Sequence, residues 1–217
     1  IHYLLPKYKL QIYGEHFQRV EHNLLSIKSA NLSDIKFVRS HAQAIGQCQN
    51  LITKNKFKTI ISADTAGSAK DLSENNDKSI AAIASDLSAE IYNLKILKKN
   101  IEDEKGNVTR FLIMGKNIQQ PTYDSNKKFI TSCIFRLKSI PSALYKCLGG
   151  FATNGINMLK LESYMIGGSF TATQFYLDIE GHPEMPSVRR AIDELKYFSS
   201  TVKVMGVYKK HQHRPKR

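Results

Sequence analysis

The chain has no long apolar run, and this absence excludes one class of protein. No stretch of its 217 residues approaches the roughly 20 apolar residues that a membrane-spanning helix requires. Residues 1–7 also lack the basic-then-apolar layout of a secretory signal peptide. The sequence therefore predicts a cytoplasmic protein with no membrane partner.

Cysteine is also scarce, which argues against disulfide and metal frameworks. The 3 cysteines, Cys48, Cys133 and Cys147, are an odd number and lack metal-ligand spacing. We predict free thiols in a reducing compartment. We also expect no metal site.

Positive charge is abundant but not concentrated. The net charge is +13 and the isoelectric point is about 9.6, values that nucleic-acid-binding proteins often show. The lysines and arginines are nevertheless scattered, and no nucleic-acid-binding module accompanies them. The one dense cluster lies at the end, in residues 209–217, and we predict that 211–217 form a frayed, solvated basic tail. Nucleic acid is therefore not an expected partner, although basic surroundings would steer a small dicarboxylate to a cleft.

Hydrophobic residues make up 41% of the chain and charged residues 24%, which is enough for one or two ordinary cores. In residues 1–115, strand patterns alternate with helix patterns, which predicts an α/β lobe with a partly parallel sheet. The expected elements are paired strands over 10–27, a strand over 36–38, a helix over 41–54, a strand over 58–62, a helix over 64–73, a close-packed run over 80–84 and a helix over 85–97.

Residues 116–127 have no periodicity and are interpreted as a linker, after which the pattern changes. The order of the predicted elements is then βαββαβ, which is ferredoxin-like. They are a strand over 128–137, a helix over 141–154, strands over 156–166 and 169–179 around a Gly167-Gly168 hairpin turn, a helix over 184–198 and a strand over 201–208.

Thr109 is the first candidate for chemistry, because it stands at the entrance of the apolar stretch 108–115, which predicts a buried strand. Such a strand would hold the hydroxyl rigidly and would point Arg110 and Phe111 to opposite faces. A structural hydroxyl is the commoner role of a threonine there. Arg110 could serve either as an anion clamp or as one partner of a structural ion pair.

Two predicted helix starts carry further polar groups. Ser40 is a natural N-cap for the helix over 41–54, on which Gln43 and Gln47 share a face and could bind a polar ligand or be solvated. Asp64 would cap the next helix. There Thr65 and the backbone amides of Ala66 and Gly67 could hold a carboxylate, or could simply form a tight turn.

These stretches follow one another in a recognisable order: Ser40–Cys48, Ala63–Ala69, Ala81–Ser85, and Asn100–Asp103 leading into Asn107–Phe111. In order and spacing they resemble the motifs of prephenate dehydratase, a lyase that converts prephenate to phenylpyruvate for phenylalanine synthesis without a cofactor. The resemblance implies a two-lobed catalytic region of the periplasmic-binding-protein kind. Ala42 replaces the proline usual in the family.

The resemblance also implies residue roles. Thr109 would donate a hydrogen bond to the leaving hydroxyl, while Ser40 and Gln47 would position the substrate. The other residues that would bind the substrate are Thr65, Ala66, Gly67, Arg110 and Phe111.

Residues 128–210 resemble the ACT domain, an amino-acid-sensing module attached to prephenate dehydratases. The resemblance implies that phenylalanine binds there as an allosteric effector and that the protein is a homodimer or homotetramer. The residues that carry it and that would bind phenylalanine are Ser142, Ala143, Leu144, Asn157, Leu159, Glu162 and Ser163.

Residues 1–115 match only the later part of the family's catalytic region, so we expect the N-terminal lobe to be missing and these residues alone to have weak or no activity. Two alternatives remain open. The chain could be a non-catalytic amino-acid sensor built on the ACT half, or its enzyme could act on arogenate, the amino analogue of prephenate.

Overall fold

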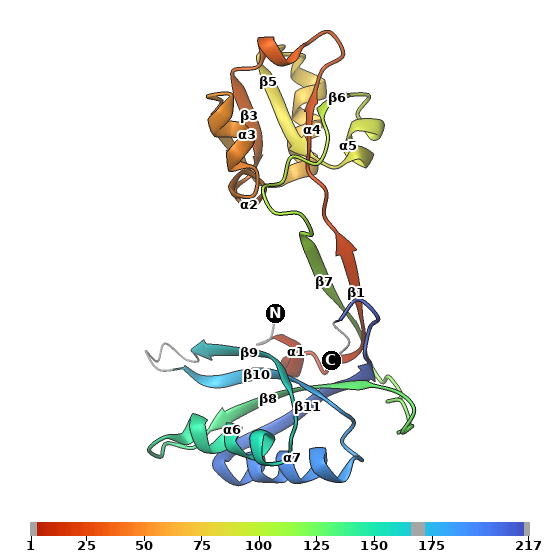
Figure 1. Ribbon diagram of the computed structural model, residues 1–217, viewed down its shortest axis with the longest axis vertical. Coiled ribbons are helices and arrows are strands. Elements are labelled where there is room, and N and C mark those ends of the chain that lie inside the picture. The colour runs from red at the N-terminus through yellow and green to blue at the C-terminus, as the bar shows by residue number, and fades with distance from the viewer. Residues whose placement is uncertain (1–3, 166–171, 215–217) are drawn as a thin grey trace. The chain divides into compact units, whose positions relative to one another are not determined.

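A computed structural model describes residues 4–165 and 172–214 (Figure 1). The chain forms two compact units. One unit comprises Gln18–Thr109, and the other combines the chain up to Phe17 with the chain from Arg110 onward. We call them the middle unit and the terminal unit and describe each by itself.

The middle unit contains a five-stranded mixed sheet in the order β4-β3-β5-β2-β6. The predicted parallel part is present, because β3 pairs in parallel with both β4 and β5. Strand β2 is antiparallel to β5 and β6. The strands are β2 (Asn23–Ser26), β3 (Phe37–His41), β4 (Lys58–Ser62), β5 (Ile80–Ala84) and β6 (Lys95–Lys98).

Short helices connect these strands. They are the 3-10 helix η1 (Leu32–Asp34), α2 (Ala42–Gly46), α3 (Gln49–Lys54), α4 (Thr65–Asn75) and α5 (Asp86–Ile91). Helix α4 packs on β3 and β5. The core is built from the buried strands β2 and β5 and from apolar helix residues such as Leu51 and Leu72.

The terminal unit contains a four-stranded antiparallel sheet in the order β11-β8-β10-β9. Its chain order is βαββαβ. The elements are β8 (Phe129–Leu137), α6 (Ala143–Thr153), β9 (Met158–Met165), β10 (Ala172–Glu180), α7 (Pro186–Phe198) and β11 (Ser199–Lys209). The expected Gly167-Gly168 turn lies outside the described residues.

The two faces of this sheet have separate cores. Helices α6 and α7 cover one face (Figure 1). On the other face, Ile12 of β1 (Gln11–Arg19) packs with residues of β8, β10 and β11. This crossing needs Gly206, because a Cβ atom there would lie 1.8 Å from the Ile12 carbonyl oxygen. The short helix α1 (Leu4–Lys7) precedes β1.

The predicted strand pairing over 10–27 is wrong. Strand β1 pairs with β7 (Val108–Gly115) in a two-stranded sheet, while β2 belongs to the five-stranded sheet. Strand β7 is not a buried strand either, because Phe111 and Ile113 are exposed along one face. The apolar run reflects packing of Leu112 and Met114 on the terminal unit's core.

The single helix predicted over 41–54 is divided into α2 and α3. Helix α2 is capped by His41, whose Nδ1 accepts the Gln43 amide, and not by Ser40. The chain turns at Cys48. Helix α3 then starts afresh because the carboxylate of Asp103 accepts the amides of Gln49 and Asn50.

Two further expectations are wrong. The helix predicted over 85–97 stops after Ile91, since Asn93 adopts a left-handed backbone (φ 54°) and β6 follows. The described part of the basic tail is not frayed. Arg214 donates to both carboxylate oxygens of Glu15, and the ring of His213 stacks on that of Phe17.

Candidate functional site

A pocket of about 380 Å³ lies within the middle unit. Parallel strands β3 and β4 end at His41 and Ser62, and helices α2 and α4 start after them. The carboxyl ends of parallel strands are where open α/β sheets bind ligands. The lining residues are Val20, His22, His41, Gln43, Ala44, Gln47, Ala63, Asp64, Thr65, Asn107 and Thr109.

Gln47 is the centre of a hydrogen-bond cluster in this pocket. Its Oε1 accepts from Asn107 Nδ2 at 2.9 Å and lies 2.8 Å from His22 Nε2. An amide oxygen only accepts, so His22 Nε2 carries the hydrogen. The Gln47 NH2 group has no hydrogen-bond partner among residues 4–165 and 172–214, so it is available to a ligand.

The segment Ile101–Asp103 supports this cluster from behind. Ile101 donates its amide to the His22 carbonyl, and Glu102 accepts the His22 amide at 3.1 Å. Asp103 donates its amide to the Gln47 carbonyl oxygen and caps α3 with its carboxylate. This stretch of the sequence is therefore a scaffold for the pocket.

The turn before α4 forms as expected, with Asp64 as its cap, but one of the predicted anion-binding amides is occupied. Asp64 Oδ1 accepts the Gly67 amide, so Gly67 is not available to a ligand. A Cβ atom at Gly67 would lie 2.9 Å from Asp64 Oδ2, which explains the glycine. Thr65 lines the pocket, and Ala66 is exposed beside it.

Thr109 and Ser40 have different environments. The side chain of Thr109 is exposed at the pocket, and its hydroxyl has no hydrogen-bond partner in the described part of the chain. Ser40 is fully buried and donates to the Ile83 carbonyl at 2.7 Å. Thr109 and Gln47 thus share the pocket, whereas the Ser40 hydroxyl fixes β3 to β5.

Arg110 and Phe111 belong to the terminal unit. The Arg110 guanidinium donates to Glu15, to Asp178 and to the Tyr208 hydroxyl at 2.6–2.7 Å. Burial by itself lowers the pKa of Arg110, but the charges of Asp178 and Glu15 raise it overall. Of the two roles left open for Arg110, the geometry supports the structural ion pair. Phe111 is 53% exposed.

Sequence reasoning assigned no role to three of the polar residues that line the pocket. His41 and Asn107 stand inside the motifs that carried the resemblance, so their position was an available signal. His22 lies between strands and outside those motifs, and only the fold brings it to Gln47, 25 residues away.

The candidate phenylalanine-binding residues lie at two ends of the terminal unit's sheet. Ser142, Ala143 and Leu144 begin α6, after the end of β8, whereas Asn157 precedes β9 near the start of β8. Strand β8 has nine residues, so these ends are roughly 27 Å apart at the usual rise per residue. They do not meet within one chain. Leu159, Glu162 and Ser163 lie between, on the edge strand β9.

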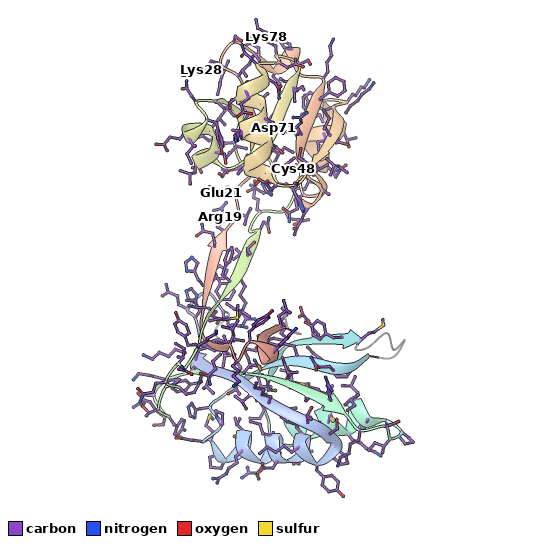
Figure 2. All side chains as sticks on the ribbon, turned by 180° about the vertical axis from the view of Figure 1, so that it is seen from behind. Arg19, Glu21, Lys28, Cys48, Asp71 and Lys78 are labelled. Carbon is purple, nitrogen blue, oxygen red and sulfur yellow. The ribbon has the colours of Figure 1, made fainter. Side chains whose placement is uncertain are left out.

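The three cysteines are free, as predicted, and all three are buried. Burial raises the pKa of Cys48 to about 12, with a contribution from Asp103 and Glu102, so its thiol is not a nucleophile at neutral pH. Figure 2 labels Cys48 in the middle unit. Across the described residues, no group of histidine, cysteine or acidic side chains has a metal-binding arrangement, and no helix could span a membrane.

Comparisons with known proteins identify the family of this chain. A model of the family described as prephenate dehydratase matches residues 1–119. A bifunctional N-acyl-homoserine lactone acylase/prephenate dehydratase from Komagataeibacter europaeus is 46% identical over 208 residues, which cover 96% of this chain and 74% of the relative. Arogenate dehydratase/prephenate dehydratase 2 from Arabidopsis thaliana is 36% identical, over 94% of this chain and 56% of its own length.

A solved structure gives the same result. Prephenate dehydratase from Arthrobacter aurescens, crystallised in complex with L-Phe, superposes with a TM-score of 0.84 at 27% identity, covering 96% of this chain and 69% of that one. The chain thus spans about half to three quarters of the lengths of these proteins. It is a member of the prephenate dehydratase family of lyases.

Proposed function

We propose that the protein to which this chain belongs is a prephenate dehydratase and that its substrate binds at the pocket of the middle unit. The observation that carries the proposal is the meeting of the Thr109 hydroxyl with the Gln47 NH2 group in one pocket, neither of which has a hydrogen-bond partner within residues 4–165 and 172–214. Both groups can donate hydrogen bonds, and the substrate is a dianion with a leaving hydroxyl.

The reaction removes carbon dioxide and water from prephenate. The bond between the ring and its carboxylate breaks, and that electron pair aromatises the ring while the ring hydroxyl leaves. The hydroxyl gains one proton and departs as water. Because aromatisation drives the reaction, the site must orient the substrate, stabilise the departing oxygen and exclude water.

The residue roles follow from this chemistry. Thr109 donates a hydrogen bond to the departing hydroxyl, since an unperturbed alcohol is too weak an acid for full proton transfer. Gln47 and Thr65 orient carboxylate oxygens with the Ala66 amide. Ser40 acts indirectly, by holding the end of β3, because its hydroxyl donates to Ile83.

We further propose that the βαββαβ part of the terminal unit is an ACT domain that binds L-phenylalanine as a feedback effector. The support is its element order and the L-Phe complex of the Arthrobacter relative. Since Ser142 and Asn157 lie at opposite ends of one sheet, a site that uses both needs two protomers. A homodimer or a homotetramer meets this requirement.

Three other functions remain candidates. The Arabidopsis relative is named for both arogenate and prephenate, so the amino analogue is a second candidate substrate. The 46% identity to the Komagataeibacter protein makes lactone acylase activity a further one. A sensor without catalytic activity would bind phenylalanine and turn over none of these compounds.

The test is a substrate panel on the parent protein. Prephenate, arogenate and an N-acyl-homoserine lactone are offered in parallel, each with and without L-phenylalanine. We expect phenylpyruvate from prephenate at a higher kcat/KM than turnover of the other two, and a rate that changes with phenylalanine. Preference for arogenate or the lactone would overturn the substrate assignment, and phenylalanine binding without any turnover would establish the sensor.

A further inference from the structure

Resting on the proposed function, we propose that His22 and Asn107 are positioning residues that orient the Gln47 amide so that it can only donate hydrogen bonds to the substrate. Neither residue needs to touch the substrate for this role. They act by fixing which end of the Gln47 amide faces the pocket.

The cluster has a defined hydrogen-bond polarity. A glutamine amide has one accepting oxygen and one NH2 group with two hydrogens, and rotation of the side chain exchanges them. Asn107 Nδ2 and His22 Nε2 both lie within 2.9 Å of Gln47 Oε1, so two donors meet this oxygen. The rotated amide would set its NH2 group against the Asn107 NH2 group, and it could donate to His22 Nε2 only if His22 changed to its other tautomer. The observed orientation is therefore the favoured one.

His22 is held rigidly enough to enforce this orientation. The residue is 5% exposed. Its amide donates to Glu102 at 3.1 Å, and its carbonyl accepts from Ile101 at 2.9 Å. A buried residue whose backbone is held on both sides loses little further freedom when its ring donates to Gln47, which makes it an effective constraint.

The orientation of the Gln47 amide decides whether it attracts or repels the ligand's carboxylates. With the oxygen engaged, Gln47 offers only N–H groups, which favour the carboxylate oxygens of a dianionic substrate. With the amide rotated, an oxygen would face the substrate and repel it. His22 and Asn107 thus convert an ambivalent side chain into a donor.

Asn107→Asp tests the inference, because it replaces the NH2 group facing Gln47 with an oxygen at nearly constant shape. We expect the Gln47 amide to rotate and donate to the new carboxylate. In protein labelled with 15N-glutamine, the Gln47 side-chain NH2 signals then shift, which is observable without any turnover. With prephenate, we expect KM to rise about tenfold or more, and kcat to fall less.

Asn100→Asp is the matched control, since it adds the same charge at an exposed position of the middle unit that does not line the pocket. It should change neither the Gln47 signals nor KM. Asn107→Ala should fall between the two, because His22 remains as a donor.

The outcomes separate the two proposals. If the unsubstituted protein makes phenylpyruvate but Asn107→Asp leaves the Gln47 signals and KM unchanged, the positioning role is wrong and the dehydratase function stands. If the unsubstituted protein makes none, the dehydratase function fails, while the NH2 signals still report whether Asn107 orients Gln47. If Asn107→Asp unfolds at the assay temperature, His22→Asn takes its place. Unchanged Gln47 signals and an unchanged KM in that variant would count against the inference.

Discussion

Two polar clusters in this protein differ in their chemistry and in their roles. In the middle unit, the Gln47 amide oxygen is bound by Asn107 and His22, and its NH2 group has no partner in the part of the chain that the structure describes. In the terminal unit, Arg110 is surrounded by charges, and the side chains of Glu15 and Asp178 are fully buried. The first cluster keeps hydrogen-bond donors available for a ligand, whereas the second uses its hydrogen bonds and charges within the protein.

The contrast is sharpest between neighbours in the sequence. Thr109 ends one unit and Arg110 begins the other. The hydroxyl of Thr109 has no partner among the described residues, while the guanidinium of Arg110 has three. Adjacent residues of one motif can therefore serve binding and stability separately.

The largest effect that we expect is on stability, and it comes from removing Arg110. Arg110→Met removes the arginine that lies 2.6 Å from the buried Asp178, where Arg214 is 3.8 Å away, and it takes one of two arginines from Glu15. We therefore expect unfolding to become easier by about 3–5 kcal/mol. Chemical denaturation measures this. Arg19→Met is the control, because Arg19 pairs with Glu21 at the surface and should contribute less than about 1 kcal/mol.

An Arg110→Met protein with unchanged unfolding but a raised KM for prephenate would reverse the assignment. Arg110 would then be an anion clamp, and the distinction between the two clusters would fail.

The next effect concerns the tail. Arg214 makes two hydrogen bonds to Glu15 and lies over the ring of Phe17. We expect Arg214→Ala to lower the unfolding free energy by about 2–3 kcal/mol, less than Arg110→Met because Asp178 and Glu15 both keep Arg110 within 2.7 Å. Thermal unfolding beside Lys209→Ala, an exposed lysine, provides the measurement. Equal stability of the two variants would mean that the tail does not contribute.

The charged cluster should also respond to acid. Burial raises the pKa of Glu15, but Arg214 and Arg110 lower it more, so the pKa lies below its ordinary value of 4.5. Its contribution to stability is therefore complete above that value and is lost as the pH falls through the folded pKa. Each pKa unit corresponds to about 1.4 kcal/mol.

We expect Glu15→Gln to flatten the loss of stability between neutral and acidic pH, as measured by denaturation at a series of pH values. Glu104→Gln, at an exposed loop position, should not. A parallel loss of stability in Glu15→Gln and the unsubstituted protein would assign the acid response to other groups.

The smallest expected effect lies in the pocket itself. Asp64→Ala removes the cap of α4 and should lower stability by about 1 kcal/mol. It also frees the Gly67 amide and removes a negative charge, so KM for the dianionic substrate should stay constant or fall. A clear rise in KM would mean that Asp64 contacts the substrate.

Local sequence patterns predicted an element correctly where neighbouring residues determine that element. The run Lys58–Ser62 is a strand with the predicted bounds, and Asp64 caps α4 because its side chain reaches an amide three residues away. The βαββαβ order followed from the same kind of periodicity.

The sequence-based predictions were wrong where residues that are distant in the sequence determine the local structure. Asp103 restarts α3 from a position 54 residues away, so no window around the helix could predict the interruption. Arg110 finds Glu15 and Asp178 at separations of 95 and 68 residues. Side chains that belong to long-range clusters remain ambiguous in the sequence, since their partners are fixed only by the fold.

The most direct test of the account is the rate of phenylpyruvate formation from saturating prephenate by Thr109→Val, compared with Thr109→Ser and the unsubstituted protein. Valine removes the hydroxyl at nearly constant shape from an exposed site. We predict a kcat lower by about 100-fold or more, rescue by serine and unchanged unfolding. A valine variant that retains most of the rate would contradict the assignment of Thr109 and, with it, the role of this pocket.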